Sequence, residues 1–467
     1  MKLNIYPDKV IGLDDAAKEK LGTLIKVYEY ASAKNAVKEK YYDGKITLGE
    51  VNLGIALPQG MRGLEIGCAW GAKTVDVLAG RSMFDGYVGE NGEEIDELNE
   101  IVRNNNLIAE YPKACRDELK IGCSFATLSA DDDIKCRIRF HSTRSAAAVW
   151  SGEKCRIAYG MAILDTRPVS ESSAEREASL LRMDTDDATW LIKKDGMNWK
   201  AEKHAHDMGR PLMEPLIYNP TSDKPLGQSR IKEPIRRLIQ GYVRTVANAT
   251  IGLEFSTAQQ KYLLGVTDEQ FDAVVNQKFK QYVGNYLAAT TNPETGEKPT
   301  FGQLQQGNIE PHVQMLRMLA TQFSAATGLT VTDTGVVNDA TPTSSDAILA
   351  QSQTLVSMAE QLNARNGDAL RTIALMAIAI ANDTTLDNLS DTQKNIVAHF
   401  VNPAMPSVAV TADAAIKIAS ARPEFAGTDT FLEMIGFDQA DIRRIKSQEQ
   451  RVRGQQILSE AVYDNIS

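Results

Sequence analysis

The chain has 467 residues, enough for about three domains of ~150 residues and for a sizeable core without disulfide bonds. Its 51 Lys and Arg residues against 61 Asp and Glu give a net charge of −10, which argues against a protein that coats nucleic acid through a broad basic surface. The cysteines are odd in number and form no CxxC pair, so we interpret all five as reduced thiols of a cytosolic product: Cys68, Cys115, Cys123, Cys136 and Cys155.

The first half of the sequence predicts a domain that mixes helices and strands. Residues 14–40 have a charged, helical pattern, and a second helix is expected from about Gly71 to Arg81. Residues 94–116 also fit helical spacing, with Pro112 expected to end or bend the element. Strands are expected in four segments rich in β-branched or aromatic residues: KIGCSFATLSA, IKCRIRFHS, CRIAYGMAILDT and TWLIKKDGMNWKAEKH. Residues 1–225 therefore predict an α+β domain.

After the turn-rich segment NPTSDKPLGQS the pattern becomes almost wholly helical. A helix is expected over about 230–254, with Ser229 as its N-cap. Another should run from about Glu310 to Thr327 and stop at Gly328. The region between these two helices carries the hairpin-like sequence TTNPETGEKPT.

The longest helix is expected from about Ser345 to Ala381, on the order of 50 Å at 1.5 Å per residue. Asn366 and Gly367 could kink it. Its apolar residues recur at spacings of three, four and seven, as one buried face requires: Ile348, Leu355, Ala359, Leu362, Ala369, Ile373, Met376 and Ile380. A last helical region follows NPAMPS and is broken by RPEFAGTD and GFDQ.

Neither a signal peptide nor a membrane span is expected. The N-terminal sequence MKLNIYPDKV has no apolar signal core. The longest uninterrupted apolar run, from Ile373 to Ala381, is far shorter than the about 20 residues that cross a bilayer.

The sequence GCAWGAKT, residues 67–74, is close to a phosphate-binding loop. Its first glycine, its lysine and its threonine stand where GxxxxGK[ST] requires them, but Ala72 occupies the position of the second glycine. No strand-like apolar run precedes the segment, so a backbone that cradles phosphate is not specified. We therefore interpret it as the start of a helix with Trp70 as a packing anchor, and keep a nucleotide site as the alternative.

Other polar clusters lack the pattern of a catalytic or metal site. His204 and His206 lie two residues apart in KHAHD, but no nearby Cys, His or carboxylate completes a metal-site spacing. The clusters ADDD (130–133) and DTDD (184–187) lack the alternating ligands of a calcium loop and predict turns between strands. No GxSxG, HExxH or catalytic Cys/His signature is present. We expect no enzyme activity, no metal and no cofactor.

Basic residues gather on the helix expected at 230–254. Five basic side chains stand against two acidic ones, a net charge of +3 in an acidic protein: Arg230, Lys232, Arg236, Arg237 and Arg244 against Glu233 and Glu254. A solvated helix face explains this cluster as well as a face toward DNA or a neighbouring subunit does.

The order of motifs resembles the portal proteins of tailed bacteriophages, in the branch typical of long non-contractile tails. The resemblance covers nearly the whole chain and rests on the order and spacing of five segments: YYDG (41–44), AWGAKTVDVLAGR (69–81), EPLIYNPTSDKPLGQSRI (214–231), FSTAQQKYLLG (255–265) and SSDAI (344–348). It implies an α+β, mainly α, ring-forming portal fold with wing, stem, clip and crown. It also implies a homo-dodecamer that is not itself an enzyme.

The resemblance assigns the parts of the chain as follows: wing 1–228, stem helices 229–254 and 309–328, clip 255–308, channel loop and long wing helix 329–384, and crown 385–467. It implies a virion protein, assembled in the host cytoplasm and placed at one capsid vertex. Double-stranded DNA would enter and leave through its channel. The expected partners are terminase, the head-completion adaptor, the major capsid protein and the scaffolding protein.

Three sets of residues are candidate contact sites. The loop ahead of the long helix has small side chains, two acidic residues and no Lys or Arg, so it is expected to line the channel: Asp333, Val336, Val337, Asn338, Asp339, Thr341 and Thr343. The basic face of the stem is Arg236, Arg237 and Arg244. Partner binding at the clip is expected at Asn292, Glu294, Glu297 and Lys298. Two alternatives stay open: a nucleotide-dependent packaging enzyme that uses Gly67–Thr74, and another capsid-associated structural protein.

Overall fold

The structure, a computed structural model, describes residues 3–51, 63, 65–89, 95–169, 175–196, 198–257, 261–264, 296, 298, 300–303, 308–336, 345–404, 408–437 and 439–464. The chain divides into two compact units. The first contains Met1–Lys45, Ala69–Ile239 and Phe323–Ser467, and the second contains Ile46–Cys68 and Gln240–Gln322.

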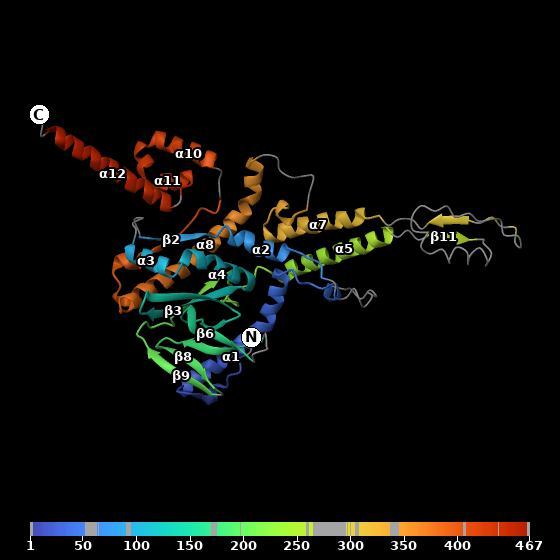
Figure 1. The fold of residues 1–467 in the computed structure, drawn as a ribbon, viewed down its shortest axis with the longest axis horizontal. Helices are drawn as coiled ribbons and strands as arrows, with labels where there is room; N and C mark the ends of the chain where they lie inside the picture. The colour runs from blue at the N-terminus through green and yellow to red at the C-terminus, as the bar shows by residue number, and fades with distance from the viewer. Residues whose placement is uncertain are drawn as a thin grey trace. The chain divides into compact units, whose positions relative to one another are not determined.

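A six-stranded sheet is the largest element of the first unit (Figure 1). Its strand order is β1-β9-β8-β7-β6-β5, and only the pairing of β1 with β9 is parallel. Its strands are β1 (Val10–Ile11), β5 (Ala146–Ser151), β6 (Arg156–Pro168), β7 (Arg176–Asp184), β8 (Ala188–Asp195) and β9 (Asn198–Ala205). Helix α1 (Asp15–Tyr42) packs on β5 and β6, and the core between helix and sheet includes Leu21, Leu24 and Trp190.

Two smaller sheets complete the strands of this unit. One has the antiparallel order β10-β3-β4, and the other pairs β13 with β2. Their strands are β2 (Phe84–Val88), β3 (Cys123–Asp131), β4 (Lys135–Ser142), β10 (Met213–Ile217) and β13 (Val397–Phe400). The long helix α8 (Ser345–Ala381) packs against both sheets, together with α4 (Leu107–Ile121) (Figure 1).

The remaining helices of the first unit are shorter or lie near the C-terminus. They are α2 (Trp70–Ala79), α3 (Asp96–Asn104), α9 (Asp391–Lys394), α10 (Val408–Ala421), α11 (Asp429–Ile435) and α12 (Gln439–Asp464). The predicted α8 is confirmed, and its helix runs unbroken through Asn366 and Gly367. The predicted breaks of the last helical region are also found, because 3₁₀ turns at Pro423–Gly427 and a left-handed Gly436 separate its helices.

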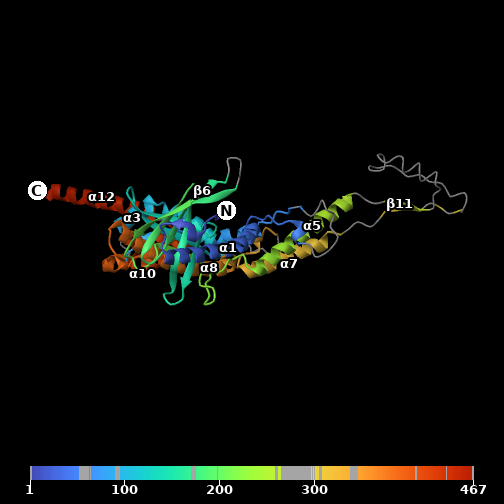
Figure 2. The same cartoon turned by 90° about the horizontal axis from the view of Figure 1, so that it is seen from below.

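The second unit includes a pair of helices and a two-stranded sheet. Helix α5 (Glu233–Thr257) enters it at Gln240, helix α7 (Glu310–Thr327) leaves it after Gln322, and the two lie side by side (Figures 1 and 2). Gly241 makes this close approach possible, because a Cβ atom there would lie 3.2 Å from the Leu319 side chain. Strands β11 (Lys261–Leu264) and β12 (Thr300–Gln303) pair antiparallel.

Two helices begin or break at other residues than the sequence predicted. Pro112 lies inside α4, which continues through it because Tyr111 and Cys115 on either side are fully buried. The break comes earlier, at the left-handed Asn106 between α3 and α4. Ser229 is not the N-cap of α5, which begins at Glu233. Its hydroxyl instead donates to the carbonyl of Lys120, at the end of α4.

Candidate functional site: the anchors of the segment before the long helix

Helix α7 ends against α8 at a tight, left-handed glycine. Gly328 has φ +72, and its N–H donates to the carbonyl of Ser324 at 2.9 Å. A Cβ atom at this position would lie 3.0 Å from the Met358 side chain and 3.2 Å from that of Thr354. Glycine therefore serves two needs here, the backbone turn and the close approach of the turn to α8.

Trp70, the first residue of α2, holds the residues that follow Gly328. Its side chain is 3% exposed and stacks on Phe323 of α7 with ring centroids 4.6 Å apart. Its indole N–H donates to the carbonyl of Thr334 at 3.0 Å. The predicted role of Trp70 as a packing anchor is confirmed, and the hydrogen bond adds a direct link to the segment that leads into α8.

Arg230 is a second anchor, which sequence reasoning missed. We predicted it as one of the basic residues on the helix at 230–254, but it precedes α5 and is 7% exposed. Its guanidinium donates to the carbonyls of Thr74 and Thr327 and to the hydroxyl of Tyr218. These acceptors satisfy a buried cation that has no carboxylate partner among the described residues. Ser229 and Arg230 lie between a turn and a helix, and nothing in the sequence there indicates that Arg230 is buried.

The segment itself, Leu329–Val336, is closed by local hydrogen bonds. The Asp333 carboxylate accepts from both the backbone N–H and the hydroxyl of Thr330, at 3.0 and 2.8 Å. This pairing ties Thr330 to the 3₁₀ turn Thr332–Thr334, which ends at the left-handed Gly335. Asp333 and Val336 are both half-buried. The other five predicted channel residues, Val337, Asn338, Asp339, Thr341 and Thr343, lie outside the described residues.

Gly71 and Thr74 of the GCAWGAKT segment are used in packing. A Cβ atom on Gly71 would lie 2.0 Å from the carbonyl oxygen of Tyr41, so glycine lets α2 approach the end of α1. The buried Thr74 hydroxyl donates to the Trp70 carbonyl at 2.8 Å, and the Thr74 carbonyl accepts from Arg230. A hydroxyl placed for a magnesium–phosphate complex would have to be free, which this one is not.

The basic face of the stem is partly neutralised. Arg236 and Arg237 both pair with Glu233, one turn earlier on α5, and hydrogen bonding from Arg236 lowers the pKa of the Glu233 carboxyl. Arg244 is half-buried and forms no ion pair with another described residue. Of the four clip residues only Lys298 is described, and it is exposed; Asn292, Glu294 and Glu297 lie outside the described residues.

The polar clusters of the wing are placed as turns and strand ends. The predicted turns are confirmed, because Asp132 and Asp133 join β3 to β4 and Thr185–Asp187 joins β7 to β8. His204 lies on β9 beside Glu202, and the ring nitrogens of His206 have no hydrogen-bond partner among the described residues. Within the described ranges, no group of three His, Cys, Asp or Glu side chains could hold a metal ion.

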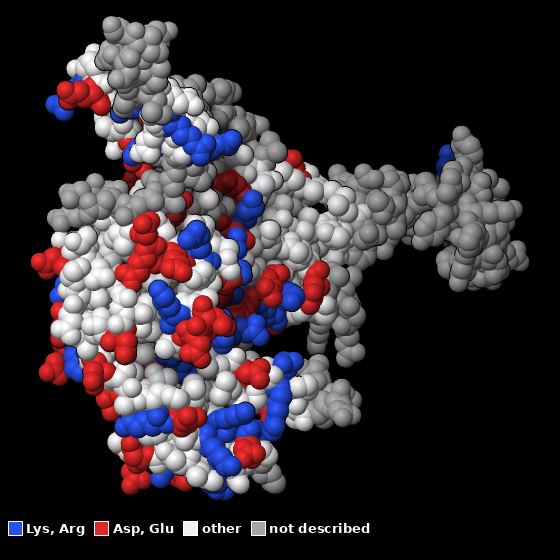
Figure 3. Space-filling model, turned by 60° about the vertical axis from the view of Figure 1, so that its left-hand side comes forward, with Lys and Arg blue, Asp and Glu red and all other residues white. Residues whose placement is uncertain are grey.

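Three further observations concern the surface charge, the thiols and the hydrophobicity of the helices. Figure 3 shows acidic and basic side chains interspersed over one face of the molecule, without a broad basic area. No disulfide bond joins any of the five cysteines, and Cys155 alone among them is exposed. Among the described helices, none is long and apolar enough to cross a membrane.

Residues 13–455 match the family described as Phage portal protein, SPP1 Gp6-like. The chain belongs to this family. As a portal protein it has the α+β, mainly α, ring-forming portal fold that the order of its motifs predicted, and the resemblance stated from those motifs is confirmed. None of the curated proteins matches the sequence significantly.

Solved structures from a gene transfer agent are similar to this portal protein at low identity. A chain of "Virion of native gene transfer agent (GTA) particle" has 11% identity and a TM-score of 0.46, with 79% of this chain and 89% of that chain covered. A chain of "Neck of empty GTA particle computed with C6 symmetry" has 12% identity and a TM-score of 0.44, with 80% and 89% covered. A chain of "Neck of native GTA particle computed with C12 symmetry" has 13% identity and a TM-score of 0.44, with 79% and 89% covered. At these TM-scores the family match is the evidence for the fold.

Proposed function

We propose that this portal protein forms a closed dodecameric ring at one vertex of a phage capsid and provides the channel through which double-stranded DNA is packaged and ejected. The family match over residues 13–455 carries the proposal. A ring closes when one subunit surface meets a different surface of the next copy by a fixed rotation. The side-by-side helices α5 and α7 suit a wall repeated around such a ring.

Within this proposal the parts keep their expected roles. Residues 1–228 and the long helix serve as wing, α5 and α7 as stem, the intervening residues as clip, and the chain from 385 as crown. The clip is the proposed docking region for terminase and the head-completion adaptor. Its described residues include the exposed Lys298. The wing and crown would contact the major capsid protein and the scaffolding protein during assembly in the host cytoplasm.

The segment anchored by Trp70 and Arg230 is the proposed start of the channel loop. Three buried contacts fix Thr327, Gly328 and Thr334, so the residues that follow begin from a rigid support. Loops on rigid scaffolds commonly carry binding functions. The small side chains and two carboxylates of residues 331–345 suit passage of DNA, because they add no phosphate contact that would hold it.

Electron microscopy and native mass spectrometry of the purified protein test the ring. A closed ring of twelve subunits with an axial hole is expected, and monomers or dimers across a range of salt and protein concentration would contradict the proposal. A packaging assay with variant rings in proheads tests the channel loop. Removal of Gly335–Thr341 should leave the ring assembled but impair filling or retention of DNA, and normal filling would remove this loop from the channel.

The proposed role is structural rather than enzymatic. The Thr74 contact supports this, because the hydroxyl that a phosphate loop would use for magnesium donates to the Trp70 carbonyl. Isothermal titration of the purified ring with Mg-ATP is expected to give no binding. Tight binding that is lost in Lys73→Ala would instead favour the nucleotide-dependent alternative.

A further inference from the structure

Two buried oxygen atoms without hydrogen-bond partners lie where α4 meets the middle of α8, both in the first unit. Asn366 of α8 donates its side-chain amide N–H groups to Glu118 Oε2 and to the Tyr111 hydroxyl of α4, at 2.8 and 2.9 Å. The other oxygen of each group, Glu118 Oε1 and Asn366 Oδ1, is buried and has no partner among the described residues. Buried polar atoms are almost always hydrogen-bonded in folded proteins, so both oxygens call for a donor.

The protonation state of Glu118 decides whether such a donor exists. An ionised carboxylate only accepts hydrogen bonds, so it would leave two acceptors, Oε1 and Oδ1, without a hydrogen. A carboxylic acid has one O–H group that can donate. Burial raises the pKa of Glu118 to about 8, against smaller opposing effects of the Asn366 hydrogen bond and of the exposed Arg365. The acid is therefore the state that suits both the hydrogen-bond geometry and the burial.

We propose that Glu118 carries a proton on Oε1 and donates it to Oδ1 of Asn366, so that the acid and the amide form two hydrogen bonds with each other and fasten α8 to α4. One proton then satisfies both oxygens, because Oε1 becomes the donor and Oδ1 its acceptor. Loss of the proton to the solvent leaves a buried carboxylate beside the amide oxygen, which breaks this second hydrogen bond. The acid–amide pair lies within one subunit, so it does not depend on the ring of the proposed function.

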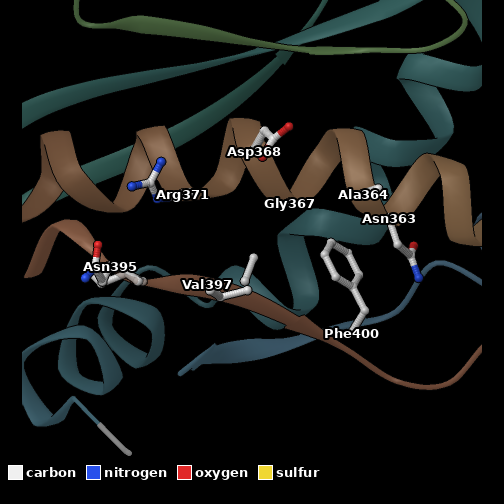
Figure 4. Close-up of a pocket in the computed structure, with 10 residues that line it drawn as sticks. Asn363, Ala364, Gly367, Asp368, Arg371, Asn395, Val397 and Phe400 are labelled. Carbon is white, nitrogen blue, oxygen red and sulfur yellow. The ribbon is translucent and has the colours of Figure 1, made fainter. Parts of the chain in front are cut away.

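The opposite side of α8 is less constrained at this level. Asn363, Gly367, Asp368 and Arg371 border an open groove of about 490 Å³ beside β13 (Figure 4). Close packing on every side would hold a helix in place even without a polar contact. Because packing is incomplete on the groove side, the acid–amide pair has a larger share in fixing the middle of α8.

Other groups near this pair are distinguished by the pH at which they titrate. Burial raises the pKa values of Tyr111, Cys115 and Cys123, so these three stay protonated between pH 6 and pH 9. Lys38 donates to the carbonyl of Ile121 at the end of α4, and burial lowers its pKa.

Two groups on strands that pack against α8 also titrate near neutral pH. Burial raises the pKa of Glu214 on β10 to about 7, against the effects of Arg210 and Arg156. Hydrogen bonding to Asp85 raises the pKa of His399 on β13 above its usual value. Each of these two groups therefore needs its own control variant.

Infrared spectroscopy in D₂O tests the position of the proton. At pH 7 the difference between wild type and Glu118→Gln should contain the C=O stretch of a carboxylic acid and no carboxylate band. Glu214 is present in both proteins, so its contribution cancels. A carboxylate band from Glu118 at pH 7 would overturn the proposal, and would mean that another donor, such as a buried water molecule, satisfies the two oxygens.

Hydrogen exchange of residues 362–371 on the full-length protein, corrected for intrinsic rates, tests whether the pair holds α8. In the wild type these amides should exchange about tenfold faster at pH 9 than at pH 6. Glu118→Gln places an N–H donor where the acid has its O–H, so it should keep slow exchange at both pH values. Asn366→Leu removes the amide and should exchange faster already at pH 6, while unchanged exchange in β7 and β8 shows that it is folded.

The control variants separate this pair from the other titrating groups. Glu214→Gln and His399→Gln should both keep the wild-type pH response of residues 362–371. The proposal is overturned if wild-type exchange in this stretch does not change with pH, or if Glu118→Gln responds to pH as the wild type does. Because the measurements also apply to dissociated subunits, failure of the ring to form would leave this proposal standing.

Discussion

The indole nitrogen of Trp70 lies 3.0 Å from the carbonyl oxygen of Thr334, so the first residue of α2 holds the segment that leads into α8. Trp70→Phe keeps a ring to stack on Phe323 but loses this hydrogen bond. We expect a loss of about 0.5–1.5 kcal/mol in the free energy of unfolding, with at least several-fold faster hydrogen exchange at residues 332–336. Urea denaturation and exchange mass spectrometry measure the two effects.

Trp150→Phe is the control for this change, because the indole of the half-buried Trp150 makes no hydrogen bond to a described residue. It should leave exchange at residues 332–336 as in the wild type. Unchanged exchange in Trp70→Phe as well would mean that the Trp70 hydrogen bond does not restrain the segment.

An ion pair is buried at the end of β7, where the strand leads into the turn DTDD. Asp184 is fully buried and accepts from the guanidinium of Arg182 and from the Thr189 hydroxyl. Arg182 also donates to the carbonyl of Leu128. Asp184→Asn leaves the buried guanidinium without its counter-charge, so we expect a loss of about 3–5 kcal/mol in the free energy of unfolding, measured by urea denaturation.

Asp195→Asn provides the comparison on the same sheet. Asp195 pairs with Lys200 at 2.6 Å, but both side chains are more than half exposed. Exposed ion pairs contribute about 0.2–1 kcal/mol, so this variant should unfold near the wild-type midpoint. If Asp184→Asn and Asp195→Asn lose similar amounts of the free energy of unfolding, burial does not make the Asp184 ion pair more stabilising than the exposed one.

The long, strongly periodic elements could be predicted from the sequence, and the buried polar anchors could not. The apolar stripe and its flanking residues placed α8 at Ser345–Ala381, and Gly328 marked the end of α7. Strand β7 was missed because its sequence REASLLRMD contains mostly good helix formers, which pairing between β6 and β8 holds in an extended form.

The site anchors depend on contacts between residues far apart in the chain. Arg230 contacts residues 97 and 156 positions away, at Thr327 and Thr74. No local pattern distinguishes such a buried arginine from the exposed Arg237 on the following helix. Trp70 could be predicted as an anchor because a large aromatic residue at a helix start must pack somewhere, but its partners could not.

His399 links the strand β13 to the C-terminal helices through charge. Its Nδ1 lies 3.6 Å from Asp85 on β2, and its Nε2 lies 3.7 Å from Glu433 on α11. Interaction with Asp85, and next with Glu433, raises the pKa of His399 above its usual value. The link is therefore fully present below the unfolded pKa of about 6.5 and is lost as pH rises through the raised folded value.

We expect hydrogen exchange of α11, corrected for intrinsic rates, to become several-fold faster between pH 6 and pH 9. His399→Gln should show the faster exchange already at pH 6, and its exchange should no longer depend on pH in this way. His204→Gln is the control, because His204 faces Glu202 on an exposed part of β9. Equal pH dependence in wild type and His399→Gln would exclude His399 as the titrating group.

A buried carboxyl group joins α4 to the middle of α8. Glu118 is fully buried, and the Asn366 side-chain amide donates to its Oε2 at 2.8 Å and to the Tyr111 hydroxyl at 2.9 Å. Burial raises the pKa of Glu118 from 4.5 to about 8, although the hydrogen bond from Asn366 opposes the shift. The folded protein therefore carries a neutral Glu118 at pH 7, whereas the unfolded chain carries a charged one.

The sign of the resulting pH dependence follows from this difference. A raised folded pKa favours the folded state fully below pH 4.5, and the advantage is lost as pH rises to about 8. The urea midpoint of the wild type should fall between pH 6 and pH 9, whereas Glu118→Gln keeps a neutral amide against Asn366 and should lose this part of the fall. Glu110→Gln, at an exposed ion pair with Lys113 on the same helix, should retain it. A fall of the same size in wild type and Glu118→Gln would show that Glu118 is ionised in the folded state at pH 6, because only a carboxyl group that takes up a proton on folding can produce the difference.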